Sequence, residues 1–182
     1  GGCQAVGNNS VCFTGAASKT SDTISYSAIN ADGTLTRTAS CSGTFYGSWC
    51  VDNTNTINGS TGVAAFAYTV FNNVIYVIGG TTGTDWQSTV WRNPLNANGS
   101  LGTWSSQTFS NLDLGAAKGY QYAFTRANPN SAGTFPGNLY VLGGCSGVSS
   151  ADNGLDCTGV MYTQVYKCNI TTTGALEEGD SN

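Results

Sequence analysis

Two stretches, VIYVIGG at residues 74–80 and NLYVLGG at residues 138–144, share a pattern that predicts the fold. Each is a run of apolar and aromatic residues that ends in a glycine pair. Where a strand ends against crowded neighbouring backbones, its last residues have no room for a Cβ atom. Glycine lacks this atom, which explains the glycine pair. Residues 1–3 read GGC, as residues 143–145 do. We therefore expect residue 1 to follow directly on a third copy of this strand, and Cys3 to correspond to Cys145.

A second motif recurs after each of these strands. Residues 24–35, 90–101 and 165–176 align without gaps, with apolar residues at equivalent places and glycine at the tenth position. Two copies carry Asp-Gly or Asn-Gly between apolar residues, which is the strongest short-range signal for a β-hairpin. The glycines at 33, 99 and 174 are 66 and 75 residues apart. The chain is therefore a repeat protein with long units.

Each unit is predicted to contain four antiparallel strands, so the fold class is all-β. The first strand is expected at 63–70 and 120–125, the second at 74–78 and 139–142, the third at 23–26, 89–92 and 164–167, and the fourth around 101–105. Alternation along the second and third strands predicts that six side chains are buried, namely Ile75, Val77, Val90, Leu139, Val141 and Val165. Tyr76 and Tyr140 are expected on the opposite face.

Composition excludes several classes of protein. Charged residues make up 9% of the chain, and six basic residues against ten acidic ones give a net charge of −4. No basic patch is available, so nucleic acid is not an expected partner. The apolar runs are too short to insert into a membrane. Aromatic residues make up 11% of the chain, which favours a folded domain over a disordered one.

The chain has seven cysteines and no histidine. The cysteines fall into local pairs without the short knuckle spacing of zinc sites, so we interpret them as disulfides that staple loops in an oxidising compartment. The predicted bonds are Cys3–Cys12, Cys41–Cys50 and Cys145–Cys157. Cys168 is left over, and it is either a buried thiol or half of a disulfide whose other cysteine lies outside the sequence.

Four-stranded units with an apolar second strand ending in Gly-Gly, followed by spaced aromatics such as Trp91 and Trp104, resemble the kelch repeat. The resemblance implies a kelch-like β-propeller, of which the chain covers about two and a half blades. Residues 1–40 would be the second half of a blade, and 41–106 and 107–182 would be complete blades. These units are longer than the roughly 50 residues usual for kelch, and cysteine-containing insertions follow the glycine pair.

No catalytic constellation stands out, so the chain is predicted not to be an enzyme and to need no cofactor or metal. Without histidine, a Ser-His-Asp triad and the histidine-ligated copper of galactose-oxidase-like kelch enzymes are both excluded within this sequence. Residues 150–154 match the opening of a sialidase Asp-box, but the three arginines fall at unrelated repeat positions. Oxygen ligands at Asp152, Asn153 and Asp156 could bind Ca²⁺, but a polar turn inside a disulfide loop is the favoured interpretation of these residues.

Three aromatic residues are candidates for stacking on carbohydrate. Tyr46 and Trp49 lie in the Cys41–Cys50 loop, and Trp86 lies in the insertion after residue 80. Packing of these rings against their own blade is the competing interpretation. N-glycosylation sequons occur at Asn8, Asn58, Asn98 and Asn169, a number that chance alone explains in a sequence so rich in Asn, Ser and Thr.

The sequence therefore favours an extracellular or cell-surface structural or adhesion protein, whose blades form a scaffold for surface interaction or self-assembly, including filaments. Its partners would be other blades of the same chain or neighbouring copies. The alternatives are a carbohydrate-binding propeller module, and a propeller enzyme with catalytic residues outside these 182 positions. Because the first blade lacks its first two strands, the chain is not expected to form a closed monomer, since its open strand edge would pair with another strand.

Overall fold

The computed structural model describes residues 3–6, 9–13, 24–52, 54–58, 62–82, 85–96, 100–108, 119, 121–129, 133–146 and 159–178. These residues are all-β, as predicted. Among them, no helix is long and apolar enough to cross a membrane. The strands are β1 (Cys3–Val6), β2 (Asn9–Phe13), β3 (Ile24–Ile29), β4 (Leu35–Thr36), β5 (Thr44–Tyr46), β6 (Trp49–Asp52), β7 (Ala67–Phe71), β8 (Val74–Ile78), β9 (Thr89–Pro94), β10 (Ser105–Thr108), β11 (Tyr122–Ala127), β12 (Gly137–Leu142), β13 (Val165–Ile170) and β14 (Leu176–Glu178).

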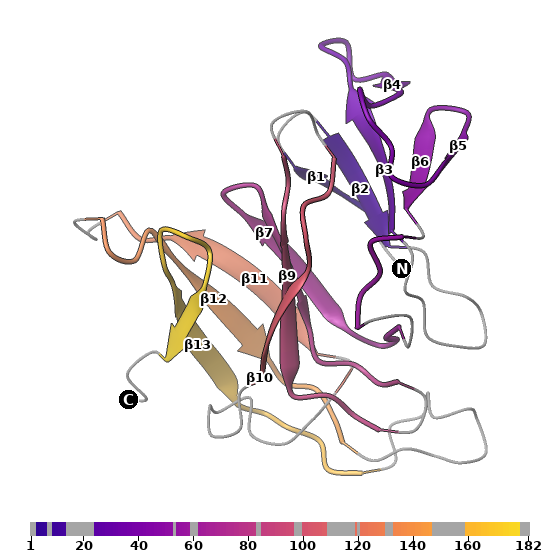
Figure 1. The fold of residues 1–182 in the computed structure, drawn as a ribbon. Helices are drawn as coiled ribbons and strands as arrows, with labels where there is room; N and C mark the ends of the chain where they lie inside the picture. The colour runs from indigo at the N-terminus through magenta and orange to yellow at the C-terminus, as the bar shows by residue number, and fades with distance from the viewer. Residues whose placement is uncertain are drawn as a thin grey trace.

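The strands form three antiparallel sheets that follow one another along the chain (Figure 1). The first sheet contains β1 to β6, the middle sheet has the order β10-β9-β8-β7, and the third sheet has the order β11-β12-β13-β14. The middle sheet lies between the other two (Figure 1). Sheets of four antiparallel strands stacked face to face are the blades of a β-propeller.

The middle and third sheets follow the predicted strand order closely. In the middle sheet, β7 and β8 are joined by Asn72 and Asn73, whose φ angles of 47° and 61° suit a two-residue hairpin turn. The fourth strand begins at Ser105, at the end of the predicted range, because Leu101 instead forms an isolated bridge with Leu95.

The glycine pairs have the role that the sequence predicted. Gly80 and Gly144 have φ angles of 93° and 99°, which side chains rarely tolerate. A Cβ atom on Gly80 would lie 2.4 Å from the carbonyl oxygen of Ala64, and one on Gly144 would lie 2.9 Å from that of Gly119. Where the second strand ends, the chain thus turns tightly against the segment that leads into the first strand of the same sheet.

Two apolar cores hold the three sheets together. One lies between the first and middle sheets and includes Ile75, Val77 and Trp91, and the other lies between the middle and third sheets and includes Tyr76 and Ile78. Strand β8 therefore contributes to both cores, one on each face. Tyr76 lies opposite Ile75 as predicted, but it is fully buried as well, because the third sheet covers its face.

One predicted core position is wrong. Val165 of β13 is 61% exposed, whereas its repeat equivalent Val90 of β9 is 2% exposed. The reason is that the third sheet covers the face of the middle sheet that carries Val90, while no described residue packs over Val165 on the corresponding face of the third sheet. The other five predicted positions, Ile75, Val77, Val90, Leu139 and Val141, are buried.

The first sheet differs from the other two in its pairing. A hairpin of β1 and β2 pairs with one edge of β3, while β4 and β6 pair with the other edge. Because β6 hydrogen-bonds to β3, residues 44–52 belong to the first sheet, and the blade boundary expected at residue 41 does not coincide with a sheet boundary.

The turn between the third and fourth strands is alike in all three sheets. The N–H of Asn30, Asn96 and Thr171 donates to the carbonyl of the residue four positions later, at 2.8, 2.9 and 2.8 Å. Gly33 and Gly174 have positive φ in this turn. Asp32 does not take positive φ, and its carboxylate instead accepts bonds from the N–H and hydroxyl of Thr34, which lower the pKa of Asp32.

Candidate functional site

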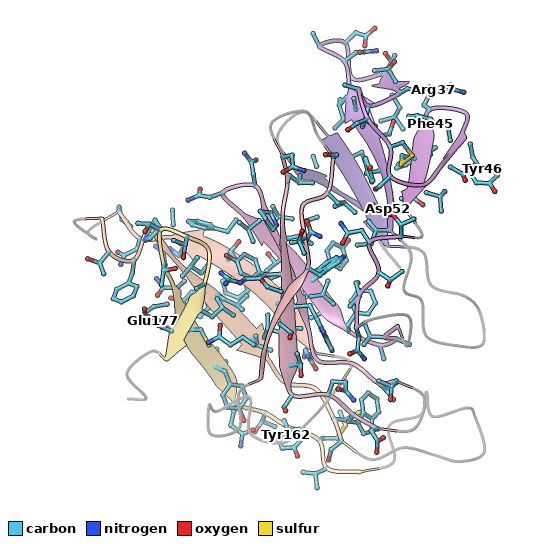
Figure 2. All side chains as sticks on the ribbon, in the orientation of Figure 1. Arg37, Phe45, Tyr46, Asp52, Tyr162 and Glu177 are labelled. Carbon is cyan, nitrogen blue, oxygen red and sulfur yellow. A yellow bond between two sulfur atoms is a disulfide. The ribbon has the colours of Figure 1, made fainter. Side chains whose placement is uncertain are left out.

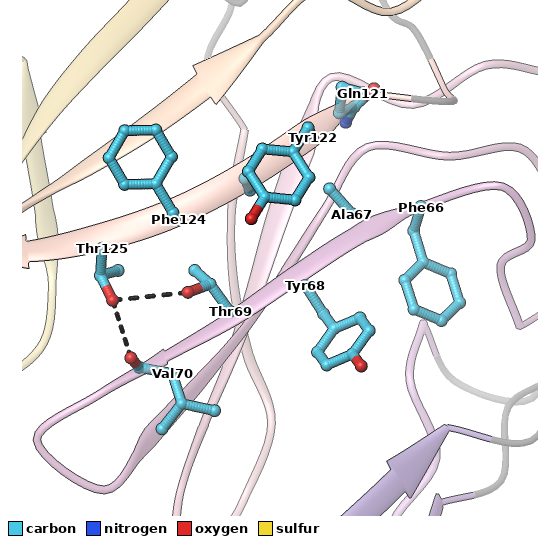
Figure 3. Close-up of a pocket in the computed structure, with 10 residues that line it drawn as sticks. Phe66, Ala67, Tyr68, Thr69, Val70, Gln121, Tyr122, Phe124 and Thr125 are labelled. Atoms are coloured by element: carbon cyan, nitrogen blue, oxygen red, sulfur yellow. Dashed lines mark hydrogen bonds between the residues drawn. The ribbon is translucent and has the colours of Figure 1, made fainter. Parts of the chain in front are cut away.

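A groove runs between β7 of the middle sheet and β11 of the third sheet (Figure 3). Its volume is about 640 Å³. Both strands are the last of their sheets, so the groove lies along two strand edges that face each other. The lining residues are Phe66, Ala67, Tyr68, Thr69, Val70, Gln121, Tyr122, Ala123, Phe124 and Thr125.

Side-chain hydrogen bonds tie the two edges together along the groove. The hydroxyl of Thr125 donates to the carbonyl of Val70 at 2.7 Å and lies 3.4 Å from the hydroxyl of Thr69 (Figure 3). At the other end, the amide of Gln121 donates to the carbonyl of Ile78 at 2.8 Å. These bonds join the two sheets through side chains of β11 and of the residue just before it.

Aromatic rings form much of the groove wall. Tyr122 is 67% exposed, and Phe124, Tyr68 and Phe66 are partly exposed. Burial of its ring raises the pKa of Tyr68. The lining residues carry no carboxylate, amine or imidazole, so their chemistry is stacking and hydrogen bonding through rings, hydroxyls and amides.

The rings of β11 continue from the groove onto the neighbouring surface of the third sheet. Phe124 stacks on Tyr140 of β12, with ring centroids 5.0 Å apart and planes 9° apart. Tyr122 and Phe124 lie with centroids 6.3 Å apart. Three aromatic side chains therefore form one row of contacts that reaches from the groove to the second strand.

The disulfide-stapled hairpin of the first sheet presents two of the predicted aromatics. Cys41 and Cys50 are bonded, as predicted, and Tyr46 lies directly opposite Trp49 at the end of the β5–β6 hairpin. Tyr46 is 65% exposed and points away from the sheet (Figure 2). Trp49 is half-buried.

Arg37 stabilises this hairpin through two contacts. Its guanidinium lies 4.8 Å from the ring centre of Phe45, and its Nε donates to the carbonyl of Gly47 at 2.9 Å. A cation over a ring and a bond to the turn both limit movement of the hairpin. The hairpin is thus a rigid projection with one exposed tyrosine near its tip.

Trp86, the third predicted aromatic, has a different setting. It forms an isolated bridge with Thr81, and a Cβ atom on Gly119 would overlap its ring, so the ring packs against the segment that leads into the third sheet. Trp86 therefore belongs to the junction of the middle and third sheets, whereas Tyr46 and Trp49 share one hairpin of the first sheet, so the three candidate aromatics do not form one surface.

Among the described residues, Asp52 is the one buried carboxylate, and it has a structural role. Asp52 accepts hydrogen bonds from the backbone N–H groups of Thr54 and Asn55, at 3.1 and 3.0 Å, and from the hydroxyls of Ser42 and Thr54. Four donors around one buried carboxylate stabilise the turn after β6. Among the described residues, no group of three or more His, Cys, Asp or Glu side chains could hold a metal ion.

The remaining cysteines and sequons are only partly described. Cys12 and Cys145 are disulfide-bonded, and the β1–β2 register places Cys12 opposite Cys3. The specific pairings Cys3–Cys12 and Cys145–Cys157 stay predictions. Cys168 is buried in β13. Asn58 has a positive φ of 54°, Asn169 lies in β13, and Asn8 and Asn98, like residues 150–157, lie outside the described residues.

Sequence reasoning missed the groove, although it predicted both strands that form it. The rings of Tyr68, Tyr122 and Phe124 occupy first-strand positions, where alternation alone assigns each ring to one sheet face. The distance between the two first strands is a tertiary feature, so no local signal could have indicated the groove.

Comparison with known proteins fits this geometry. Curated protein sequences give no match to the chain. One protein family, the Kelch motif, matches residues 63–92, which include β7, β8 and the first four residues of β9. The chain is a kelch-like repeat protein. Kelch repeats are scaffolds for protein interaction, and the third sheet of this kelch-like protein repeats the strand order of the matched segment.

Proposed function

We propose that this kelch-like protein is a non-enzymatic structural or adhesion protein of the extracellular space or cell surface, whose sheets serve as a scaffold for surface interaction and self-assembly. The observation that carries the proposal is the stack of three sheets that ends on an exposed aromatic face, formed by Tyr122, Phe124 and Tyr140. Exposed apolar patches of this kind on soluble proteins mark interaction sites.

Two further features support this setting. The Cys41–Cys50 disulfide and the disulfide-bonded Cys12 and Cys145 suit an oxidising compartment. The low charge and the hydroxyl-rich surface favour stable contacts over electrostatic capture of a charged partner. Other blades of the same polypeptide or neighbouring copies are the partners that the sheet faces suit best.

An antibody against the chain tests the proposal on cells that encode it. We expect labelling of intact cells, and weaker attachment of cells to one another or to surfaces after deletion of the gene. Labelling that requires permeabilised cells would overturn the extracellular assignment. Unchanged attachment would overturn the adhesion role.

A second candidate function is carbohydrate binding, and the groove between β7 and β11 favours it. Rings of Phe66, Tyr68 and Tyr122 beside the hydroxyls of Thr69 and Thr125 match the mixture of stacking and hydrogen bonding that sugars need. The Tyr46–Trp49 pair on the stapled hairpin offers a second ring surface. A glycan array separates the two sites, because Tyr122→Ala would remove binding in the groove and Trp49→Ala would remove binding at the hairpin.

A further inference from the structure

A smaller pocket lies at the junction of the middle and third sheets, beside β9 and β10 and away from the groove at β7. Its volume is about 170 Å³. Residues from β8 to β10 form most of its wall, and the turn between β13 and β14 completes it. The lining residues of this Arg92 pocket are Val74, Arg92, Pro94, Thr103, Ser105 and Thr173.

The guanidinium of Arg92 is held in place at this junction. Cross-strand register puts Tyr76, Arg92 and Ser105 in one row, on the face of the middle sheet that the third sheet covers. The Nε of Arg92 donates to the hydroxyl of Ser105 at 2.9 Å. Burial raises the pKa of Tyr76, and the nearby positive charge of Arg92 partly offsets this rise. Because the Tyr76 hydroxyl donates to the carbonyl of Gly174, the guanidinium lies close to the turn of the third sheet.

The positive charge of Arg92 has no carboxylate partner among the described residues. Its hydrogen bond to Ser105 uses Nε, which leaves the N–H groups of Nη1 and Nη2 as donors. The lining residues of the pocket carry no carboxylate either. Val74 and Pro94 form apolar parts of the wall, and Arg92 is partly buried, so solvent screens its charge less than that of an exposed arginine.

These groups suit an oxyanion with a single negative charge. The planar fork of a guanidinium matches two oxygens of a carboxylate or a sulfate group. The hydroxyls of Thr103 and Thr173 supply further donors in the wall. The chain has a net charge of −4 and does not attract anions from a distance, so direct contact with Arg92 has to supply the recognition.

A second small pocket adjoins the first. Its volume is about 70 Å³, and it shares Val74 and Thr173 with the Arg92 pocket. Its wall includes the ring of Phe71, the amide of Asn72 and the hydroxyls of residues 171–173. A ring surrounded by hydroxyls and an amide suits a neutral sugar unit. A charged site beside a neutral polar one therefore favours a saccharide over a simple anion.

We propose that Arg92 binds the carboxylate or sulfate group of an acidic saccharide, and that the pocket beyond Thr173 receives the neighbouring sugar unit. This site is separate from the groove between β7 and β11. It does not depend on the scaffold function or on an extracellular location. A single ion pair at a partly exposed site gives weak binding, so we expect a dissociation constant on the order of millimolar for a disaccharide.

A titration of the isotope-labelled protein with a uronic-acid disaccharide, followed by nuclear magnetic resonance, tests the proposal. We expect the Nε–H signal of Arg92 and the backbone amides of Ser105 and Thr173 to shift with a common binding constant. The matching neutral disaccharide should bind about tenfold more weakly or less, because it lacks the anion. Unchanged signals at these three groups would overturn the proposal, and so would equal binding of the neutral sugar.

Substitutions with matched charge separate the pocket from the overall charge of the chain. Arg92→Gln should weaken binding of the uronic-acid disaccharide about tenfold or more. Arg126→Gln removes the same charge at an exposed position of β11 and should leave binding unchanged. Equal effects of these two variants would overturn the assignment to the pocket.

The variant Arg92→Lys tests the geometry of the contact. It keeps the positive charge but loses the planar fork, so binding should weaken about threefold or more. Full affinity in this variant would overturn the two-oxygen contact. Because Arg92 is only partly buried, all three variants should keep the unfolding midpoint of the original protein, which separates loss of the site from loss of the fold.

Two further probes identify the class of ligand. A sulfated disaccharide measured beside the uronic-acid disaccharide shows which anion the pocket prefers, and binding of either one through Arg92 supports the proposal. An acidic tetrapeptide that binds through Arg92 as tightly as the disaccharides would overturn the assignment to a saccharide.

The outcomes also distinguish this inference from the proposed function. Loss of saccharide binding in Arg92→Gln supports the site even in a protein found only inside cells, where the extracellular role would be wrong. A protein that cells display and need for attachment, but that binds none of the acidic disaccharides, would keep its scaffold function without this site.

Discussion

The middle and third sheets share strand order, turn geometry and a similar second strand, yet they differ in how many of their faces are covered. Strand β8 is buried on both sides, with Ile75 and Val77 toward the first sheet and Tyr76 toward the third. In strand β12, Leu139 and Val141 are buried toward the middle sheet, whereas Tyr140 on the other side is only partly buried. Equivalent residues therefore have different energetic roles, because burial depends on the neighbouring sheet as well as on the strand.

The tyrosines of the two second strands give the largest expected contrast. Tyr76 is fully buried, and its hydroxyl donates to the carbonyl of Gly174 at 2.9 Å. Tyr76→Ala should lower the free energy of unfolding by about 3–5 kcal/mol, as truncation of a large core residue does. Tyr140→Ala should cost about 1–2 kcal/mol, since the ring is only partly buried. Denaturant unfolding of both variants measures the difference, and equal losses would mean that the third sheet is covered on both faces.

The pH dependence of unfolding at alkaline pH is a second test of the burial of Tyr76. Burial raises the pKa of Tyr76 to about 12, partly offset by the positive charge of Arg92. Because the folded protein holds this proton more tightly than the unfolded chain, the contribution is complete below about pH 10 and is lost as the pH rises toward 12.

The linked free energy is of the order of 2–3 kcal/mol. Tyr76→Phe should therefore make the midpoint of unfolding less dependent on pH between 10 and 12 than it is in the original chain. Parallel pH profiles of the two proteins would contradict this prediction.

The equivalent valines of the two third strands, Val90 and Val165, should show a smaller difference in the free energy of unfolding. Val90→Ala should cost about 1–3 kcal/mol, because it leaves a cavity between the middle and third sheets. Val165→Ala should change the free energy of unfolding by less than about 0.5 kcal/mol at concentrations where the chain is monomeric. Thermal or denaturant unfolding checks both values. A large loss at Val165 would show that some part of the chain covers the face of the third sheet that carries this residue.

The smallest effect is expected at the seam between the two sheets. Thr125→Val removes the hydroxyl that donates to the carbonyl of Val70 while keeping the shape of the side chain. The loss should be about 0.5–1.5 kcal/mol, the usual value of one hydrogen bond. Thr134→Val, at an exposed turn, serves as the control and should be neutral. Equal unfolding midpoints for both variants would show that the seam bond contributes nothing.

Much of the strand order could be predicted from the sequence, because the decisive signals are local. Alternation over a few residues identifies β8 and β9, and the glycines at 80 and 144 mark places where a Cβ atom would meet a carbonyl. Proximity in the chain also sufficed for the Cys41–Cys50 disulfide, since nine residues separate the two. None of these features depends on a distant segment.

Features that join distant segments could not be predicted. The pairing of β6 with β3 places residues 49–52 in the first sheet, although they precede the middle sheet in the repeat pattern. The groove between β7 and β11 depends on how far apart two sheets lie. Alternation also cannot tell a face that packs on another sheet from one that does not, which is why Val165 was wrongly predicted to be buried.

The sequence by itself determined that this protein is an all-β, kelch-like repeat, because strand alternation, paired glycines and hairpin turns are properties of short segments. Only the tertiary structure decided which sheet faces are covered, which strand edges meet in a groove, and that Tyr122, Phe124 and Tyr140 gather on one open face. The physical reason is that burial is a relation between two surfaces. A strand specifies the chemistry of its two faces, and the packing of neighbouring sheets decides which of those faces solvent can reach.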